Sequence, residues 1–75
     1  MRAVTDDEFM TLRPKDRVRT VKNARVPSGM LLIVIWIQRS NAGTAFGRFR
    51  TAYDSDAELL SDGTCFLFPR EVERA

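Results

Sequence analysis

Residues 30–37 read Met-Leu-Leu-Ile-Val-Ile-Trp-Ile, and this unbroken apolar run decides the fold of the 75-residue chain. Ser28 and Gly29 precede the run, and polar residues follow it at positions 38–41. A strand points alternate side chains to opposite faces, so a strand made of this run needs cover on both faces. In so short a chain, we expect the N-terminal segment or a second copy of the chain to supply that cover.

The length and composition predict a single domain that needs help to fold. A chain of 75 residues is near the size below which a hydrophobic core alone is insufficient. Cys65 is the only cysteine and there is no histidine, so neither an internal disulfide nor a typical zinc site is expected. Self-association is the remaining means of stabilisation, and the sequence therefore predicts a homo-oligomer.

The lone cysteine also bears on where the protein acts. Cys65 lies in an apolar string, where a small buried side chain is its expected role. A lone thiol and the absence of a signal peptide predict a reducing, cytoplasmic environment. The apolar run at 30–37 is much shorter than the roughly 20 residues that a membrane-spanning helix needs, so no membrane association is expected.

The N-terminal segment has the pattern of a short helix. Thr5 and Glu8 have the form of a capping box, with a hydroxyl at the N-cap and a carboxylate three residues later. A helix over residues 6–12 places Phe9 and Leu12 on one apolar face. Because two turns of helix are marginal in isolation, we expect this face to pack on the sheet.

Strand and turn patterns alternate along the rest of the chain. Pro14 ends the helix, and Asp62-Gly63 is a strong hairpin signal because both residues tolerate positive φ. The predicted strands are residues 17–21, 30–38, 45–53, 58–60 and 64–68, and a single helical turn follows at 70–74. This order predicts an all-β domain, a small five-stranded SH3-like barrel with a short N-terminal helix and a C-terminal single helical turn. One domain spans 1–75, with 1–13 as the N-terminal helical extension and 14–75 as the barrel.

The net charge of +2 conceals a strong segregation of charge along the chain. Residues 13–50 carry nine basic side chains and one acid, whereas the rest of the chain carries three basic side chains and nine acids. Strand geometry places Arg17 with Arg19, and Arg48 with Arg50, on one face of their respective strands. If these strands lie close together, the four guanidinium groups form a patch suited to phosphates or carboxylates.

Two interpretations of these arginines remain open. In one, they bind a polyanion such as nucleic acid. In the other, they form a solvent-exposed face of the sheet and pair with acidic residues of the third hairpin, the segment between the predicted strands 45–53 and 64–68. Those acids are Asp54, Asp56, Glu58 and Asp62. Binders of single-stranded nucleic acid add exposed aromatic side chains. The candidates here are Tyr53, Trp36 and Phe46, and we expect two of the three to be buried.

Groups suited to catalysis or to cofactor binding are scarce. Without histidine, the common acid–base and triad arrangements are excluded. The aspartates at 54, 56 and 62 fall in turn contexts that explain them, and the four glycines are too dispersed to form a phosphate-binding loop. The sequence therefore predicts no catalytic residue, no cofactor and no metal.

Two segments resemble known proteins. Lys15-Asp16-Arg17-Val18-Arg19 resembles the Gly-Asp-Arg-Val-Arg opening of many SH3-like barrels. Cys65-Phe66-Leu67-Phe68-Pro69, followed by Val72-Glu73-Arg74, resembles the end of the plasmid-borne type II dihydrofolate reductases, which is Val-Gln-Ile-Tyr-Pro and then Leu-Glu-Arg. Members of that family are homotetramers of SH3-like barrels with one active site in a central pore. The resemblance implies an SH3-like fold, self-association and carriage on a mobile gene cassette.

The catalytic residues of that family do not carry over to this chain. Thr20 stands where the family has a lysine after its Arg-Val-Arg, and Phe66 and Phe68 stand where it has the pore glutamine and tyrosine. A site for folate and nicotinamide needs polar groups to orient its ligands, and two phenylalanines supply none. The resemblance therefore implies the fold without the reductase activity.

The leading hypothesis is a non-enzymatic binding module that self-associates and binds a protein or peptide partner. The expected oligomer interface consists of Leu32, Val34, Trp36, Phe66 and Phe68. One alternative is a small-molecule or reductase-like site at the axis of an oligomer. The other is nucleic-acid binding through Arg17, Arg19, Arg48 and Arg50.

Overall fold

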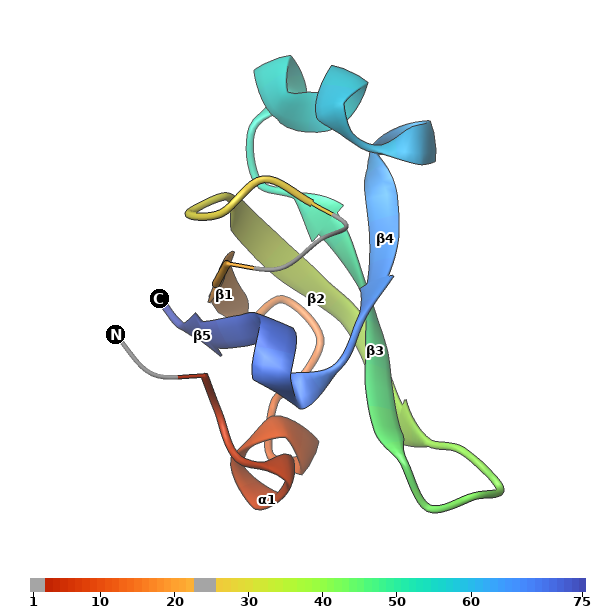
Figure 1. The fold of residues 1–75 in the computed structure, drawn as a ribbon. Helices are drawn as coiled ribbons and strands as arrows, with labels where there is room; N and C mark the ends of the chain where they lie inside the picture. The colour runs from red at the N-terminus through yellow and green to blue at the C-terminus, as the bar shows by residue number, and fades with distance from the viewer. Residues whose placement is uncertain (1–2, 23–25) are drawn as a thin grey trace.

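The computed structural model describes residues 3–22 and 26–75, which form a small, mostly β protein (Figure 1). Its strands are β1 (Arg17–Thr20), β2 (Leu31–Arg39), β3 (Ala45–Thr51), β4 (Thr64–Leu67) and β5 (Val72–Arg74). Its helices are α1 (Asp6–Met10) and the 3₁₀ helices η1 (Asp54–Leu59), η2 (Ser61–Gly63) and η3 (Pro69–Glu71). The predicted all-β class with a short N-terminal helix is confirmed. Arg25, one of the basic residues counted above, lies outside the described residues.

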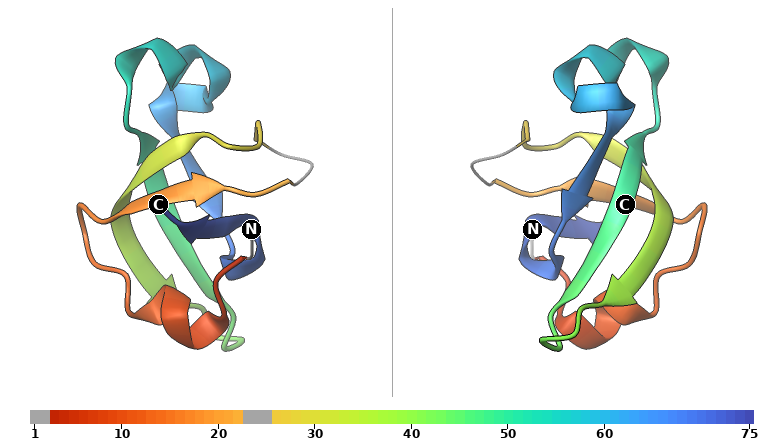
Figure 2. Two further views of the ribbon diagram at one scale, coloured as in Figure 1. Left: turned by 90° about the vertical axis from the view of Figure 1, so that its left-hand side faces the viewer. Right: turned by 90° about the vertical axis from the view of Figure 1, so that its right-hand side faces the viewer.

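The strands form one antiparallel sheet in the order β4-β3-β2-β1-β5. β2, which contains most of the apolar run, is the central strand and pairs with β1 on one side and with β3 on the other. After β4 the chain turns through η3, and β5 then pairs with β1, so the last strand lies next to the first. Figure 2 shows that the strands twist strongly and that α1 lies at one end of the sheet.

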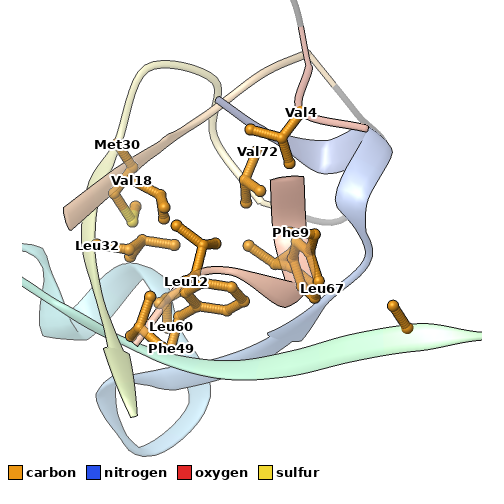
Figure 3. Packing of buried hydrophobic residues seen from close by; sticks show 12 residues of the cluster. Val4, Phe9, Leu12, Val18, Met30, Leu32, Phe49, Leu60, Leu67 and Val72 are labelled. Atoms are coloured by element: carbon orange, nitrogen blue, oxygen red, sulfur yellow. The ribbon is translucent and has the colours of Figure 1, made fainter. Parts of the chain in front are cut away.

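The core lies on the inner face of this sheet, which is the face whose side chains point toward α1 and the interior (Figure 3). Strand alternation places Val18, Leu32, Phe49 and Leu67 there, and none of them has any exposed surface. Burying an apolar side chain of this size contributes about 1.5–3 kcal/mol. The inner face is therefore the main source of stability.

The predicted capping box begins α1. The Thr5 hydroxyl accepts a hydrogen bond from the Glu8 N–H at 3.2 Å, and the Glu8 carboxylate accepts one from the Thr5 N–H at 3.0 Å. The helix ends at Met10, two residues earlier than predicted. Because so short a helix is unstable alone, its place depends on packing.

The N-terminal segment packs into the core, as predicted. Phe9 is fully buried, and its ring centroid lies 6.1 Å from that of Phe49. Leu12 is also in the core, and the Val4 N–H donates a hydrogen bond to the Val72 carbonyl at 2.9 Å. These contacts are all on the inner side of the sheet. The described part of the N-terminal segment, from residue 3 onward, therefore packs on the inner face of β2.

Near the C-terminus, one predicted strand is wrong and the predicted helical turn is present over a different range. Residues 58–60 are predicted as a strand, but the chain forms the 3₁₀ helix η1 up to Leu59. The run from Asp54 to Glu58 consists of residues with low strand propensity, and this local preference prevails. The predicted helical turn at 70–74 is limited to η3, and residues 72–74 form β5 instead, because they pair with β1. Asp62 and Gly63 have the predicted positive φ, at 58° and 68°.

The side chain of Thr20 forms hydrogen bonds with the loop between β1 and β2. Its side chain is fully buried, and its hydroxyl donates a hydrogen bond to the Pro27 carbonyl at 2.6 Å. The same hydroxyl accepts a bond from the Met30 N–H at 2.9 Å. The Gly29 N–H donates to the Thr20 carbonyl at 2.8 Å, with Gly29 at a φ of 81°. One threonine therefore satisfies several polar groups in the described part of this loop.

Replacing Thr20 by valine tests this role. Thr20→Val preserves the shape but leaves a buried N–H and a carbonyl without their partner, so the free energy of unfolding should fall by about 1–3 kcal/mol. Urea denaturation measures the change. The exposed Thr44→Val is the matched control, and its effect should stay within about 0.5 kcal/mol. Equal stability of the two variants would contradict the role of the hydroxyl.

Candidate functional site

Side chains that point away from the core form a second, outer face of the sheet. The register aligns them in rows: Arg17, Ile33 and Arg50 face one another across β1, β2 and β3. A second row joins Trp36, Arg48 and Phe66 across β2, β3 and β4. Phe46 of β3 lies next to this row. We call Arg17, Trp36, Phe46, Arg48, Arg50 and Phe66 the arginine–aromatic patch.

A bulge in β2 places Trp36 in this patch. Val34 pairs with Phe49 and faces the core, whereas Trp36 pairs with Arg48 and faces outward. Two residues apart on a regular strand would share a face. The register shift between Val34 and Trp36 inserts Ile35 as an extra residue and reverses the orientation of the later side chains of β2. Trp36 is consequently half-buried instead of lying in the core.

Gly47 makes room for the strand just beyond this bulge. A Cβ at position 47 would lie 3.0 Å from the Trp36 carbonyl oxygen and 3.2 Å from the ring of Phe49. Gly47 pairs with Ile37 and is itself buried. The nearest atom to that Cβ would be the Ile37 Cδ1, at 2.5 Å, so a side chain at position 47 fits only if Ile37 moves and the Trp36 backbone gives way slightly.

The aromatic rings of the patch form one connected cluster. The centroids of Trp36 and Phe46 are 5.6 Å apart in an edge-to-face arrangement, and those of Trp36 and Phe66 are 5.8 Å apart. Phe66 is 47% exposed, whereas Trp36 and Phe46 are half-buried. The three rings therefore present an apolar surface that is held in one geometry and is partly open to solvent.

Arg48 is fixed within the cluster. Its Cζ lies 4.9 Å from the ring centroid of Phe66, a cation–π geometry, and its Nη2 donates a hydrogen bond to the Thr64 hydroxyl at 3.1 Å. A guanidinium has five N–H donors, so these contacts leave donors for a ligand. Arg48 is therefore oriented in advance for a planar anionic group.

Arg17 and Arg50 are exposed on either side of Ile33. Arg50 makes one long hydrogen bond of 3.4 Å, to the Thr51 carbonyl. Within the described residues, neither of them nor Arg48 forms an ion pair with a carboxylate. The proposed pairing with the acids of the third hairpin is therefore not observed, because η1 and η2 carry those acids beyond the end of the sheet (Figure 1).

Arg19, the fourth of the predicted arginines, is directed elsewhere. Its Nη1 donates a hydrogen bond to the Gly29 carbonyl at 3.1 Å, in the loop between β1 and β2. It lines an open pocket of about 250 Å³ between that loop and η1, together with Tyr53, Asp56 and Leu59. The structure thus groups Arg17, Arg48 and Arg50 and places Arg19 at the edge.

The predicted interface set is divided by the structure. Leu32 and Val34 are 0% and 2% exposed and belong to the core of the single chain. Trp36 and Phe66 belong to the arginine–aromatic patch. Phe68 is half-buried outside it, with the Cζ of Arg70 5.4 Å from its ring centroid. Uninterrupted alternation would put Leu32, Val34 and Trp36 on one face, and the bulge is what separates them.

The aromatic side chains are also more accessible than the sequence pattern predicts. Tyr53 is 59% exposed, and Trp36 and Phe46 are both half-buried, so none of the three is fully buried. Phe66, which is absent from the predicted stacking residues, is more exposed than Trp36 or Phe46. Cys65 is half-buried and packs against the core.

Comparisons of the chain with protein-family models, curated proteins and solved structures give no match. In the part of the chain that the structure describes, no group of three or more acidic or cysteine side chains has the arrangement of a metal site. Across residues 3–22 and 26–75, the helices lack the length and apolar character of a membrane span. The arginine–aromatic patch brings three arginines and three aromatic side chains together on one face of the sheet.

Gly47→Ala tests whether the close backbone approach at the bulge positions Trp36. The added methyl group would displace the Ile37 side chain and press on the Trp36 carbonyl, so we expect a loss of stability of about 1–3 kcal/mol and a changed Trp36 fluorescence spectrum. Gly43→Ala is the control: its Cβ would meet no atom within 4 Å, although its φ is 86°. Its cost should be about 1–2 kcal/mol, with the Trp36 spectrum unchanged. A normal spectrum in Gly47→Ala would refute the positioning role.

Proposed function

We propose that this protein is a non-enzymatic binding module, built on an SH3-like barrel, that binds an acidic and apolar segment of a protein partner on the arginine–aromatic patch. The observation that carries the proposal is the combination of three partly open aromatic rings with three arginines that have no carboxylate partner within the described residues. Tryptophan, phenylalanine and arginine are the residue types enriched at protein interfaces.

One feature supports the barrel as the architecture of this module. β5 returns to pair with β1, so the last strand of the chain lies beside the first, and the sheet that they share is strongly twisted. In such a fold the outer face of the sheet is available to a partner.

The side chain of Phe66 supports binding over reductase chemistry. In the resemblance to the reductase family, Phe66 stands where that family has its pore glutamine, and the ring of Phe66 contacts Arg48 and Trp36. An aromatic ring in this setting offers contact area and no hydrogen bond to orient a folate or nicotinamide. We therefore favour a macromolecular partner in a cytoplasmic setting.

Peptide selection tests the proposed function. From a display library of random peptides, we expect enrichment of sequences that combine Asp or Glu with aromatic or aliphatic residues. Phe66→Ala and Arg50→Gln should each weaken the selected peptides by roughly tenfold, because central aromatic and arginine residues dominate interface energetics. Fluorescence polarisation measures the affinities.

The control for this experiment is Arg13→Gln, which removes the same charge from an exposed residue outside the patch. It should bind the selected peptides as the wild type does. Selection of peptides without acidic residues, or equal binding by Phe66→Ala and the wild type, would overturn the proposal.

Single-stranded nucleic acid is a second candidate partner, which the nearness of arginines to partly open rings favours. Three phosphate contacts predict that log K for a thymidine oligonucleotide falls against log salt with a slope of about −2. A variant with Arg17, Arg48 and Arg50 all replaced by Gln should bind with a slope near zero. A slope unchanged by this triple replacement, or no binding at low salt, would eliminate this candidate.

A further inference from the structure

The chain itself carries a segment with the chemistry that the patch selects. We call residues 53–62, which run from the residue before η1 into η2, the acidic tip. Its carboxylates are Asp54, Asp56, Glu58 and Asp62, and it contains no basic residue. Tyr53 and Leu59 are 59% and 57% exposed, the highest values among the large apolar side chains described. The tip is therefore both acidic and apolar at its surface.

The acidic tip is held in a defined shape. Leu60 is 9% exposed and belongs to the core cluster, which anchors the tip to the sheet. Within it, the Asp56 N–H donates to the Tyr53 carbonyl at 3.0 Å and the Leu60 N–H donates to the Ala57 carbonyl at 3.2 Å. A preformed segment loses less conformational entropy on binding than a flexible one.

Among the described residues of one molecule, the carboxylates of the tip do not form ion pairs with the arginines of the patch. Neither Asp54 nor Glu58 forms an ion pair within the described residues, and neither Arg17 nor Arg50 does. Figures 1 and 2 show that η1 and η2 project beyond the end of β3 and β4. Arg17 and Arg50 belong to the strands β1 and β3. The arginines of the patch and the carboxylates of the tip therefore remain unpaired with each other in the part of one chain that the structure describes.

We propose that the acidic tip of one copy docks on the arginine–aromatic patch of a second copy. This rests on the proposed function and names its partner. Arg17 and Arg50 pair with the tip carboxylates, and Leu59 and Tyr53 cover Phe66 and Trp36. The charge complementarity supports this occupant, since a patch-against-patch dimer would bring arginine against arginine.

The tip and the patch are different surfaces of the chain, so one contact between two copies does not use up the binding surfaces of either copy. Each copy keeps one unused tip or one unused patch after the first contact, so the association closes into a ring or continues into an open array. The contact also covers the outer face of β2 at Ile33 and Trp36, which the N-terminal segment leaves half-buried.

The test is complementation between two neutralised variants. The patch variant carries Arg17→Gln and Arg50→Gln, and the tip variant carries Asp54→Asn and Glu58→Gln; all four positions are exposed. We expect wild-type protein to have a mass above the monomer by light scattering at low salt, and each variant alone to be a monomer. An equimolar mixture should form a one-to-one dimer and nothing larger, because one intact tip meets one intact patch.

A matched control carries Arg13→Gln and Lys22→Gln, which remove two exposed positive charges outside the patch. It should keep the wild-type mass. A monomeric wild type at low salt, variants with wild-type mass, or a mixture that remains monomeric would each overturn the self-docking. Peptide binding that is lost in Arg50→Gln while the wild type stays monomeric would overturn self-docking alone and leave the proposed function standing.

Discussion

The structure depends on the burial of one face of β2. Leu32 and Val34 on that face meet Phe49 from β3 and Phe9 from α1 in a single core. Within residues 3–22 and 26–75, the N-terminal segment and β5 contribute Phe9, Leu12 and Val72 to the cover of this face. On the other face Ile33 and Trp36 stay half-buried, so the outer side of the sheet is partly open.

The arginines on the outer face of the sheet keep that face soluble in water and also suit it to binding a partner. Arg17, Arg48 and Arg50 lie beside Ile33, Trp36 and Phe66 across the strands. The aliphatic stems of arginines cover apolar surface while their guanidinium groups stay in water. A partner that offers carboxylates and apolar side chains replaces both interactions at once, which is why charge and hydrophobicity select the same class of partner.

Much of the fold was predictable because it follows local rules. Side-chain chemistry over a few residues accounts for the capping box of α1, for the strands predicted at 17–21, 30–38 and 45–53, and for the positive φ at Asp62 and Gly63.

The orientation of Trp36 was not predictable from β2 alone, because eight consecutive apolar residues show no alternation that a bulge could interrupt. The sequence offered one indication of the bulge, and it lies in the partner strand. There Gly47 interrupts the alternation of apolar and polar side chains along β3. β5 was missed because its conformation comes from pairing with β1, which is distant in the sequence.

That pairing of the first strand with the last has a kinetic consequence. Val18 lies opposite Arg74, so one edge of β1 has no partner until residues 72–74 have been synthesised and have found it. Contacts between distant parts of a chain form late, because closing a long loop costs entropy before any contact compensates for it. The sheet can grow early through the neighbouring pairs β1–β2, β2–β3 and β3–β4, but its edge at β1 stays exposed to incorrect pairing during that interval. Once it has paired, β5 becomes the edge strand on that side of the sheet, and an edge strand of only three residues offers little backbone to incorrect pairing.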